Sequence, residues 1–114
     1  MEWTLDDCEG RTTVRMVGDC DLYSAPRFKT AMLRKIEDGV RRLLLDMSGV
    51  RYLDSTGVGA IICILQAARK SGGELRFSGV SGSPRRVLEM SSILPLMKLE
   101  GSMAREARPA GGYR

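Results

Sequence analysis

The sequence of 114 residues contains no histidine, the side chain that most often serves as a general base or a zinc ligand. No segment approaches the roughly 18 consecutive apolar residues of a membrane-spanning helix. The first ten residues, MEWTLDDCEG, are acidic and lack the basic flank and apolar stretch of a signal peptide. We therefore expect a soluble cytoplasmic protein with no membrane partner and no histidine-based active site.

Aromatic residues and cysteines are also scarce. Aromatic side chains make up 5% of the chain and do not interleave with the basic residues, so the net charge of +4 lacks the base-stacking groups of a nucleic-acid interface. The basic residues stand mostly as pairs near the ends of predicted elements, where water solvates them. Three cysteines, an odd number at wide spacing, indicate reduced thiols and no disulfide framework. We expect no direct nucleic-acid partner.

The residues that are present suffice for one globular domain. A chain of 114 residues with 43% hydrophobic residues can bury one core of ordinary size. The sequence contains no internal repeat and no linker-like segment. From residue 108 onward little could be buried. We expect one domain over residues 1–107 and a flexible tail over residues 108–114.

The first part of the chain predicts a β-hairpin followed by a helix. Apolar and polar residues alternate from residue 3, a turn is predicted at residues 9–10, and the β-branched residues 12–17 predict a second strand. A helix is predicted to begin near Ser24 or Ala25, with Pro26 in its first turn.

The middle of the chain, residues 43–73, has the strongest pattern. Residues 43–47 predict a buried strand that ends at Ser48-Gly49, and a brief crossover leads to Asp54-Ser55-Thr56, each of which can cap a helix. The helix is predicted to end at Gly72-Gly73. Its predicted buried face consists of Val58, Ile61, Ile62, Leu65 and Ala68.

The last part of the chain continues the alternation of strands and helices. A strand is predicted at residues 74–79, a helix at residues 85–92 with Met90 facing inward, a short strand at residues 96–99, and one or two helical turns at residues 102–107. The chain therefore predicts an α/β fold with right-handed crossovers. We expect a mixed, largely parallel sheet of about four or five strands packed with about four helices.

Two stretches resemble the STAS domain as found in bacterial anti-sigma factor antagonists. LLLDMSGVRYLDSTGVGAI is similar to the family's apolar strand, aromatic residue and Asp-Ser-Ser/Thr-Gly-hydrophobic-Gly at a helix start. GDCDLYSAPRF is similar to a second landmark, Gly-Glu-Leu-Asp followed by Ala-Pro. The resemblance covers nearly the whole chain. It departs from the pattern at Asp19 and Cys20, where the family has a glutamate and an aliphatic residue, and at Ser92-Ile93, where Gly-Leu is common.

The resemblance implies partner switching in transcription regulation. In this family the unphosphorylated antagonist binds an anti-sigma factor that is also a serine kinase, so the sigma factor is released. Phosphorylation of the serine after the aspartate, here Ser55, ends the complex, and a PP2C-type phosphatase reverses it. ATP and magnesium belong to the kinase, so we expect no cofactor, metal or catalytic residue in this chain. The predicted partner-binding residues are Asp21, Asp54, Ser55, Thr56 and Gly57, with Tyr23, Ser24 and Arg27 as weaker candidates.

The chemistry of the Asp54-Ser55 pair is consistent with this implication. A serine at a helix N-terminus lies beside free N–H groups and the positive end of the dipole, which would stabilise an attached phosphate. Asp54, with Asp21 and Asp46 if the fold brings them near, would repel the added charge. Gly57 and Gly59 are predicted to leave the hydroxyl open to a kinase. The alternative is that Ser55 or Thr56 only caps the helix.

Other functions fit the sequence less well. Gly57-Val58-Gly59 lacks a third glycine at the dinucleotide-binding spacing, and no Gly-Lys-Ser/Thr is present. Ser55 does not lie in a Gly-x-Ser-x-Gly elbow and has no histidine to activate it, so an enzyme is not expected. The remaining alternative is a non-switching STAS module, either a stress-signalling scaffold or a transporter accessory subunit.

Overall fold

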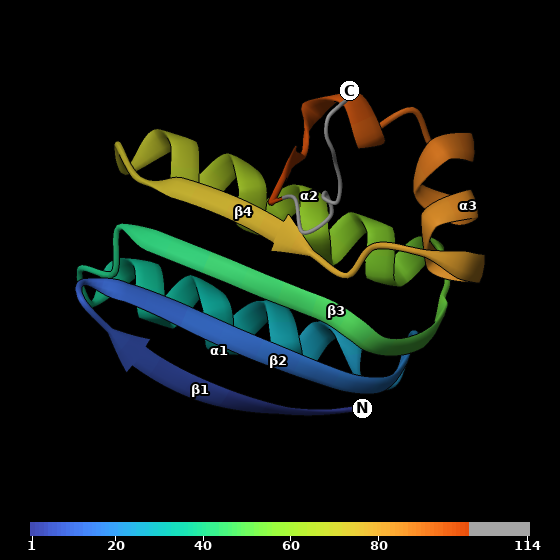
Figure 1. Ribbon diagram of the computed structural model, residues 1–114, viewed down its shortest axis with the longest axis horizontal. Coiled ribbons are helices and arrows are strands. Elements are labelled where there is room, and N and C mark those ends of the chain that lie inside the picture. Colours follow the sequence, from blue (N-terminus) through green and yellow to red (C-terminus); the bar gives the residue numbers. More distant parts are fainter. Residues whose placement is uncertain (101–114) are drawn as a thin grey trace, which may run out of the picture.

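The computed structural model describes residues 1–100 and contains one five-stranded sheet with the strand order β1-β2-β3-β4-β5 (Figure 1). Strand β1 (Glu2–Cys8) is antiparallel to β2 (Arg11–Cys20). The strands β3 (Arg42–Leu53), β4 (Glu74–Ser78) and β5 (Lys98–Leu99) follow in parallel. The predicted hairpin and the mixed, largely parallel sheet are confirmed.

Helices cover one face of this sheet. Helices α1 (Ala25–Glu37) and α2 (Ser55–Lys70) pack against each other on that face, and α3 (Gly82–Met90) lies at one end, followed by a 3-10 turn, η1 (Leu94–Leu96) (Figure 1). Residues 1–100 thus contain three α-helices, slightly fewer than expected. The turns predicted at residues 102–107 and the predicted tail lie outside the described residues.

The hydrophobic core lies between the sheet and the two long helices. It is built from apolar side chains that alternate along the strands and recur at helical spacing on α1 and α2. Trp3 on β1 is partly buried and packs edge to face against Phe28 on α1, with ring centroids 5.1 Å apart. The fully buried large side chains are Val14, Met16, Cys20, Phe28, Met32, Leu45, Met47, Leu53, Ile61, Ile64, Phe77 and Leu88.

The third strand is longer than the sequence predicted. The strand was expected to end at Ser48-Gly49, but β3 continues to Leu53. A Cβ atom on Gly49 would lie 2.6 Å from the carbonyl oxygen of Met16, so the absent side chain lets β2 approach at a shift in register. The continuation places Leu53 opposite Cys20, and both strands end side by side.

Two apolar residues lie outward where the sequence predicted them inward. Ile62 is 37% exposed, and Ile64 is buried in its place. Met90, in the last turn of α3, is 80% exposed. In both helices the buried face is narrower than the face formed by the apolar residues. Helical periodicity alone therefore places residues at the edge of the apolar face in the core.

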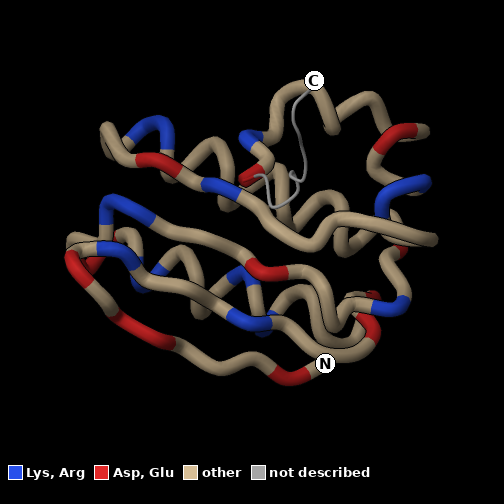
Figure 2. The backbone as a smooth tube through the Cα atoms, viewed as in Figure 1, with Lys and Arg blue, Asp and Glu red and all other residues tan. Residues whose placement is uncertain are grey.

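Charged residues recur along the strands of the sheet (Figure 2), and several of them pair on the sheet face opposite the helices. Arg15 on β2 pairs with Asp46 on β3 at 3.3 Å, and Glu74 on β4 pairs with Arg76 at 2.8 Å and with Lys98 at 3.7 Å. Such pairs keep the face solvated and contribute little to stability individually. None of the helices within residues 1–100 combines the length and apolar character required to cross a membrane.

Candidate functional site at the start of α2

Helix α2 begins directly after β3, and Asp54 caps it. The Asp54 backbone is extended, with φ −105° and ψ −176°, and its Oδ1 accepts a hydrogen bond of 2.9 Å from the Gly57 N–H. This is the geometry of an N-cap residue. Ser55, the first helical residue, and Thr56, the second, are both exposed. The capping role is therefore filled by Asp54.

The Ser55 hydroxyl is accessible at the positive end of the helix dipole. Within residues 1–100 no hydrogen bond engages its Oγ atom. The N–H groups of the first turn point toward this end of the helix, and only the Gly57 N–H is taken by the Asp54 side chain. A phosphate on Ser55 would lie beside the remaining donors, so the helix can carry it without unfolding.

The same aspartate joins α2 to the loop between β2 and α1. Its Oδ2 accepts a hydrogen bond of 3.1 Å from the Leu22 N–H, and its own N–H donates to the Cys20 carbonyl at 3.2 Å. These contacts connect residues more than thirty positions apart in sequence. Asp54 thus holds the two ends of the parallel strands β2 and β3 together at the site.

Asp21 organises the loop itself. Its Oδ1 accepts hydrogen bonds from the N–H groups of Tyr23 at 3.0 Å and Ser24 at 3.1 Å, and the Ser24 hydroxyl lies at 3.1 Å. Loss of hydration acts to raise the pKa of Asp21, but the hydrogen bonds from Ser24 and Tyr23 outweigh it and hold that pKa below its ordinary value of 3.8. The loop therefore carries a negative charge near Asp54 at neutral pH.

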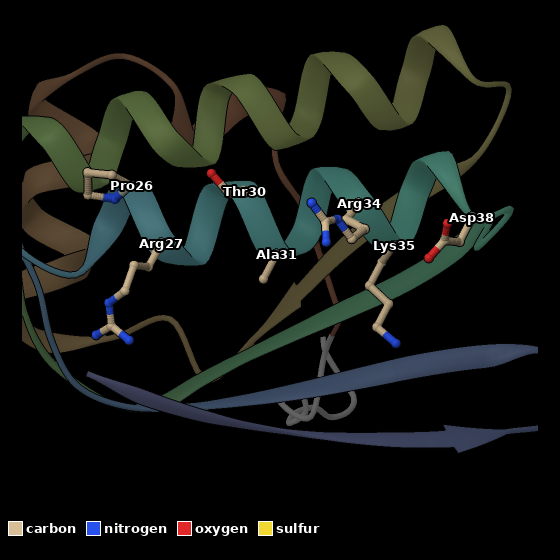
Figure 3. Close-up of a pocket in the computed structure, with 7 residues that line it drawn as sticks. All are labelled: Pro26, Arg27, Thr30, Ala31, Arg34, Lys35 and Asp38. Atoms are coloured by element: carbon tan, nitrogen blue, oxygen red, sulfur yellow. The ribbon is translucent and has the colours of Figure 1, made fainter.

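The predicted partner-binding residues differ in their exposure. Tyr23 is 81% exposed, whereas Ser24 is 3% exposed and its hydroxyl lies 2.8 Å from the Asp19 carbonyl oxygen. Ser24 stabilises the loop from its buried side, so a substitution of Ser24 would affect partner binding only through the shape of the loop. Arg27 lies over the Trp3 ring, 5.8 Å from its centroid, on the side of α1 that faces away from α2 (Figure 3).

Asp46 does not belong to the site. It lies eight positions before Asp54 along β3, which is about 26 Å in an extended strand. Its Oδ1 accepts hydrogen bonds from the Ser48 N–H at 3.0 Å and the Ser48 hydroxyl at 2.7 Å. Asp46 thus organises its own strand, and the conditional expectation that it lies near Ser55 is not met.

Gly57 has a different role from the one predicted. It is buried, and a Cβ atom there would lie 2.5 Å from the Leu53 Cδ1 atom and 2.7 Å from the Cys20 carbonyl oxygen. Its missing side chain lets the first turn of α2 approach the ends of β2 and β3. At Gly59 a Cβ atom would meet nothing within 4 Å. Neither glycine is needed to expose the Ser55 hydroxyl.

Cys20 lies beneath the site as a packing residue. It is fully buried, and this burial, with the carboxylates of Asp54 and Asp21 as lesser causes, raises its pKa to about 11. The thiol therefore stays protonated and unreactive near neutral pH. In the described part of the chain no cluster of three or more acidic or cysteine side chains is placed to hold a metal ion.

Two exposed apolar residues of the site escaped the sequence analysis. Leu22 is 57% exposed in the loop beside Tyr23, and Tyr52, near the end of β3, is 48% exposed. Leu22 could have been found from the sequence, because a leucine in a short polar loop between a strand and a helix is often exposed.

A groove of about 600 Å³ runs along the outer side of α1 (Figure 3). Its lining residues come from α1 and from Asp38, which directly follows α1, and three of them, Arg27, Arg34 and Lys35, are basic. The groove is a shallow basic surface on one helix and contains no buried polar side chain that would define a ligand site.

Removing the Asp54 cap is expected to lower stability measurably. In Asp54→Ala the Gly57 N–H loses its partner, so we expect the free energy of unfolding to fall by about 1 kcal/mol. Asp54→Asn keeps a side-chain oxygen at the cap and should lose much less. Urea unfolding followed by circular dichroism measures both. Equal stability of Asp54→Ala and the wild type would contradict the capping role.

Comparison with known proteins places this geometry among characterised domains. A family profile of the STAS domain matches residues 3–105. The anti-sigma-B factor antagonist of Staphylococcus aureus strain NCTC 8325 is 31% identical over 84 residues, which cover 74% of this chain and 78% of that protein. The residues matched by the STAS profile include the start of α2 and the loop before α1.

Solved structures show the same arrangement of elements. An anti-sigma factor antagonist from Mycobacterium paratuberculosis superposes with a TM-score of 0.78 at 20% identity, covering 90% of this chain and 86% of that one. The Bacillus cell fate determinant SpoIIAA in its phosphorylated form superposes with a TM-score of 0.70 at 17% identity, covering 89% and 93% of the two chains. At these identities the superpositions bear on the fold alone.

Proposed function

The chain belongs to the STAS domain family of anti-sigma factor antagonists, and on that premise we propose that it binds an anti-sigma factor serine kinase and thereby releases a sigma factor. Phosphorylation of Ser55 by that kinase ends the complex, and a PP2C-type phosphatase restores the binding form. Because the kinase holds ATP and magnesium, this chain acts as a regulatory protein in the cytoplasm with no cofactor of its own.

The observation that carries the proposal is the exposed Ser55 hydroxyl in the first turn of α2. A kinase needs an accessible hydroxyl, and Ser55 is exposed with its Oγ atom free of hydrogen bonds to residues 1–100. The helix N-terminus accommodates a phosphate, as it does in many anion sites. Phosphorylation is therefore compatible with the fold and acts on the surface.

The added charge explains the loss of partner binding. A phosphoserine carries about −1.5 to −2 charges at pH 7. It would stand next to the Asp54 carboxylate, which holds the loop that carries Asp21 through the Leu22 N–H. Burying this charge in an interface without a matching cation costs several kcal/mol by general experience with unpaired buried ions. A partner that fits the unmodified surface is thus excluded from the modified one.

Phosphate transfer from ATP tests the proposal directly. Purified kinases from the same genome with a histidine-kinase-like ATP site are incubated with the chain and labelled ATP, and the acceptor is located by peptide mass spectrometry. We expect stoichiometric incorporation at Ser55 with one of them, loss of incorporation in Ser55→Ala, and retention in Thr56→Ala. Transfer to Thr56 alone would contradict the assignment. No transfer by any of them, combined with tight binding to a transporter ATPase, would favour the non-switching module.

A further inference from the structure

Strand β1 forms one edge of the sheet, and few of the features that usually block pairing at an edge are present there (Figure 1). Within residues 1–100 no strand pairs with its outer side. Its seven residues pair with β2 without a bulge, and none of them is proline, glycine or lysine. Edge strands are commonly short, bulged or protected by proline or lysine. The opposite edge, β5, fits this rule with two residues, one of them Lys98.

The turn after β1 determines which of its backbone groups face outward. Residues 9–10 form a two-residue turn with φ values of 52° and 79°, as in a type I′ turn. Cys8 and Arg11 close this turn as a hydrogen-bonded pair. Hydrogen-bonded and non-hydrogen-bonded pairs alternate along an antiparallel ladder. Every second residue of β1 therefore directs its N–H and C=O groups away from β2, and these residues are Trp3, Leu5 and Asp7.

These outward groups are complementary to the same groups of a second copy. When two β1 strands lie antiparallel with Leu5 opposite Leu5, Trp3 of each copy lies opposite Asp7 of the other. Each outward N–H then meets an outward C=O, which gives about six hydrogen bonds between the copies. Leu5 is 43% exposed in one chain and would be covered by its counterpart. The edge thus matches itself in both its hydrogen bonds and its central side chain.

The register centred on Leu5 also keeps the carboxylates of β1 apart. It pairs all seven residues, with Glu2 opposite Cys8 and Asp6 opposite Thr4. A register centred on Thr4 would place Glu2 opposite Asp6, and one centred on Asp6 would place two copies of that carboxylate opposite each other. Like charges directly opposite destabilise a strand pair. The charges therefore select the same register that gives the largest overlap.

The charge of α1 favours a second copy over an unrelated strand. Strand β1 carries three carboxylates and no basic residue (Figure 2). Arg27 lies over the Trp3 ring at 5.8 Å, and Arg34 and Lys35 lie with it on the side of α1 that faces away from α2 (Figure 3). Because Trp3 lies opposite Asp7 of the second copy, that carboxylate comes beside Arg27. The acidic strand and the basic helix side belong to one chain, so two copies complement each other twice.

We propose that two copies of this chain associate through β1, antiparallel and centred on Leu5, to form one continuous sheet. Addition of a strand at a free edge is a recurrent mode of protein association. Strand β2 lies between this edge and β3, which leads to Ser55. The inference does not depend on the proposed function. Failure of the association would leave the proposed switch at Ser55 intact, and absence of phosphorylation would leave the association intact.

A disulfide between the two copies tests the register. In a Glu2→Cys variant the new thiol lies opposite the exposed Cys8 of the second copy, in a non-hydrogen-bonded pair with Cα atoms about 4.5 Å apart, which suits a disulfide. Within one chain the two positions are about 20 Å apart along the strand, so they cannot join. In a Cys63→Ala background, mild oxidation should yield a covalent dimer, and peptide mass spectrometry should locate its link between residue 2 and Cys8.

Asp6→Cys in the same background is the matched control. Position 6 is exposed on the same face of β1, but in the proposed register it lies opposite Thr4, so no link to Cys8 is expected. A predominant link between residue 6 and Cys8 would centre the pairing on Asp7 and overturn the register. Equal yields of dimer from both variants would show random collision and would overturn the inference.

Sedimentation equilibrium tests the association in the wild-type chain. We expect the average mass to rise with concentration from 12.6 kDa toward twice that value. Leu5→Lys places two ammonium groups opposite each other at the centre of the interface, so its dissociation constant should rise at least about tenfold. Val17→Lys adds the same charge on β2, at a side chain that is 54% exposed, and should associate like the wild type.

Both lysine variants should keep a midpoint of urea unfolding close to that of the wild type, because both positions are solvent-exposed. A wild-type mass that stays at 12.6 kDa at the highest concentration reached would overturn the inference. A dimer that Leu5→Lys leaves unchanged would place the contact elsewhere on the surface and would overturn it as well.

Discussion

A Ser55→Asp variant is expected to bind the kinase about a hundredfold more weakly than the wild type, which corresponds to about 2.7 kcal/mol. The substitution places a carboxylate in the first turn of α2, next to the Asp54 carboxylate that already caps the helix. The helix tolerates the charge because its N-terminus favours anions. The interface does not tolerate the charge, because a partner that fits the unmodified surface has no additional cation opposite residue 55.

Calorimetry of the kinase with each variant measures this difference. Gln66→Glu adds the same charge to an exposed position of the same helix, eleven residues further along, or about 16 Å along the axis. We expect this control to bind like the wild type, and Ser55→Ala to bind as tightly as the wild type while accepting no phosphate. Equal weakening by Ser55→Asp and Gln66→Glu would show a general charge effect and would contradict a local switch.

A Gly57→Ala variant is expected to be the most destabilising single-methyl change in the site. The added Cβ atom would lie 2.5 Å from the Leu53 Cδ1 atom and 2.7 Å from the Cys20 carbonyl oxygen. A side chain can turn away, but the carbonyl belongs to the end of β2, so α2 would have to move. Overpacking of this kind costs typically about 1–3 kcal/mol, and contact with backbone places this case near 3 kcal/mol.

Gly59→Ala is the matched control, two residues along the same helix. A Cβ atom there would meet nothing within 4 Å, so we expect the free energy of unfolding to stay the same or rise by up to about 1 kcal/mol, as helical glycine is replaced by alanine. Urea unfolding of both variants measures the contrast. A Gly57→Ala variant as stable as Gly59→Ala would show that α2 does not pack against β2 and β3 as described.

The fold could be predicted from local patterns because most of its elements carry their own signals. The alternation in β4, the Ser-Ala-Pro start of α1 and the Asp54 cap of α2 lie within a few residues of the structure that they specify. The full length of β3 could not be predicted, since Gly49 ends a strand in most contexts. Here its missing side chain accommodates the Met16 carbonyl of the neighbouring strand, and that contact is not local in sequence.

The exposed serine at the start of α2 was predictable from the sequence, and its surroundings were less so. Asp54-Ser55 has the local signature of a helix start, so exposure of Ser55 follows from the sequence. The hydrogen bond from the Leu22 N–H to Asp54 joins two segments that only the parallel pairing of β2 and β3 brings together. The exposed Leu22 and the packing role of Gly57 depend on that pairing, so neither could be read from the sequence alone.

The affinity of the kinase for three preparations of the wild-type chain tests the central claim most directly. These are the unphosphorylated protein, the protein fully phosphorylated at Ser55, and the phosphorylated protein after treatment with a PP2C-type phosphatase. We predict that the unphosphorylated protein binds tightly and that the phosphorylated protein binds at least about a hundredfold more weakly. Phosphatase treatment should restore tight binding. Equal affinity of all three preparations would contradict a switch at Ser55.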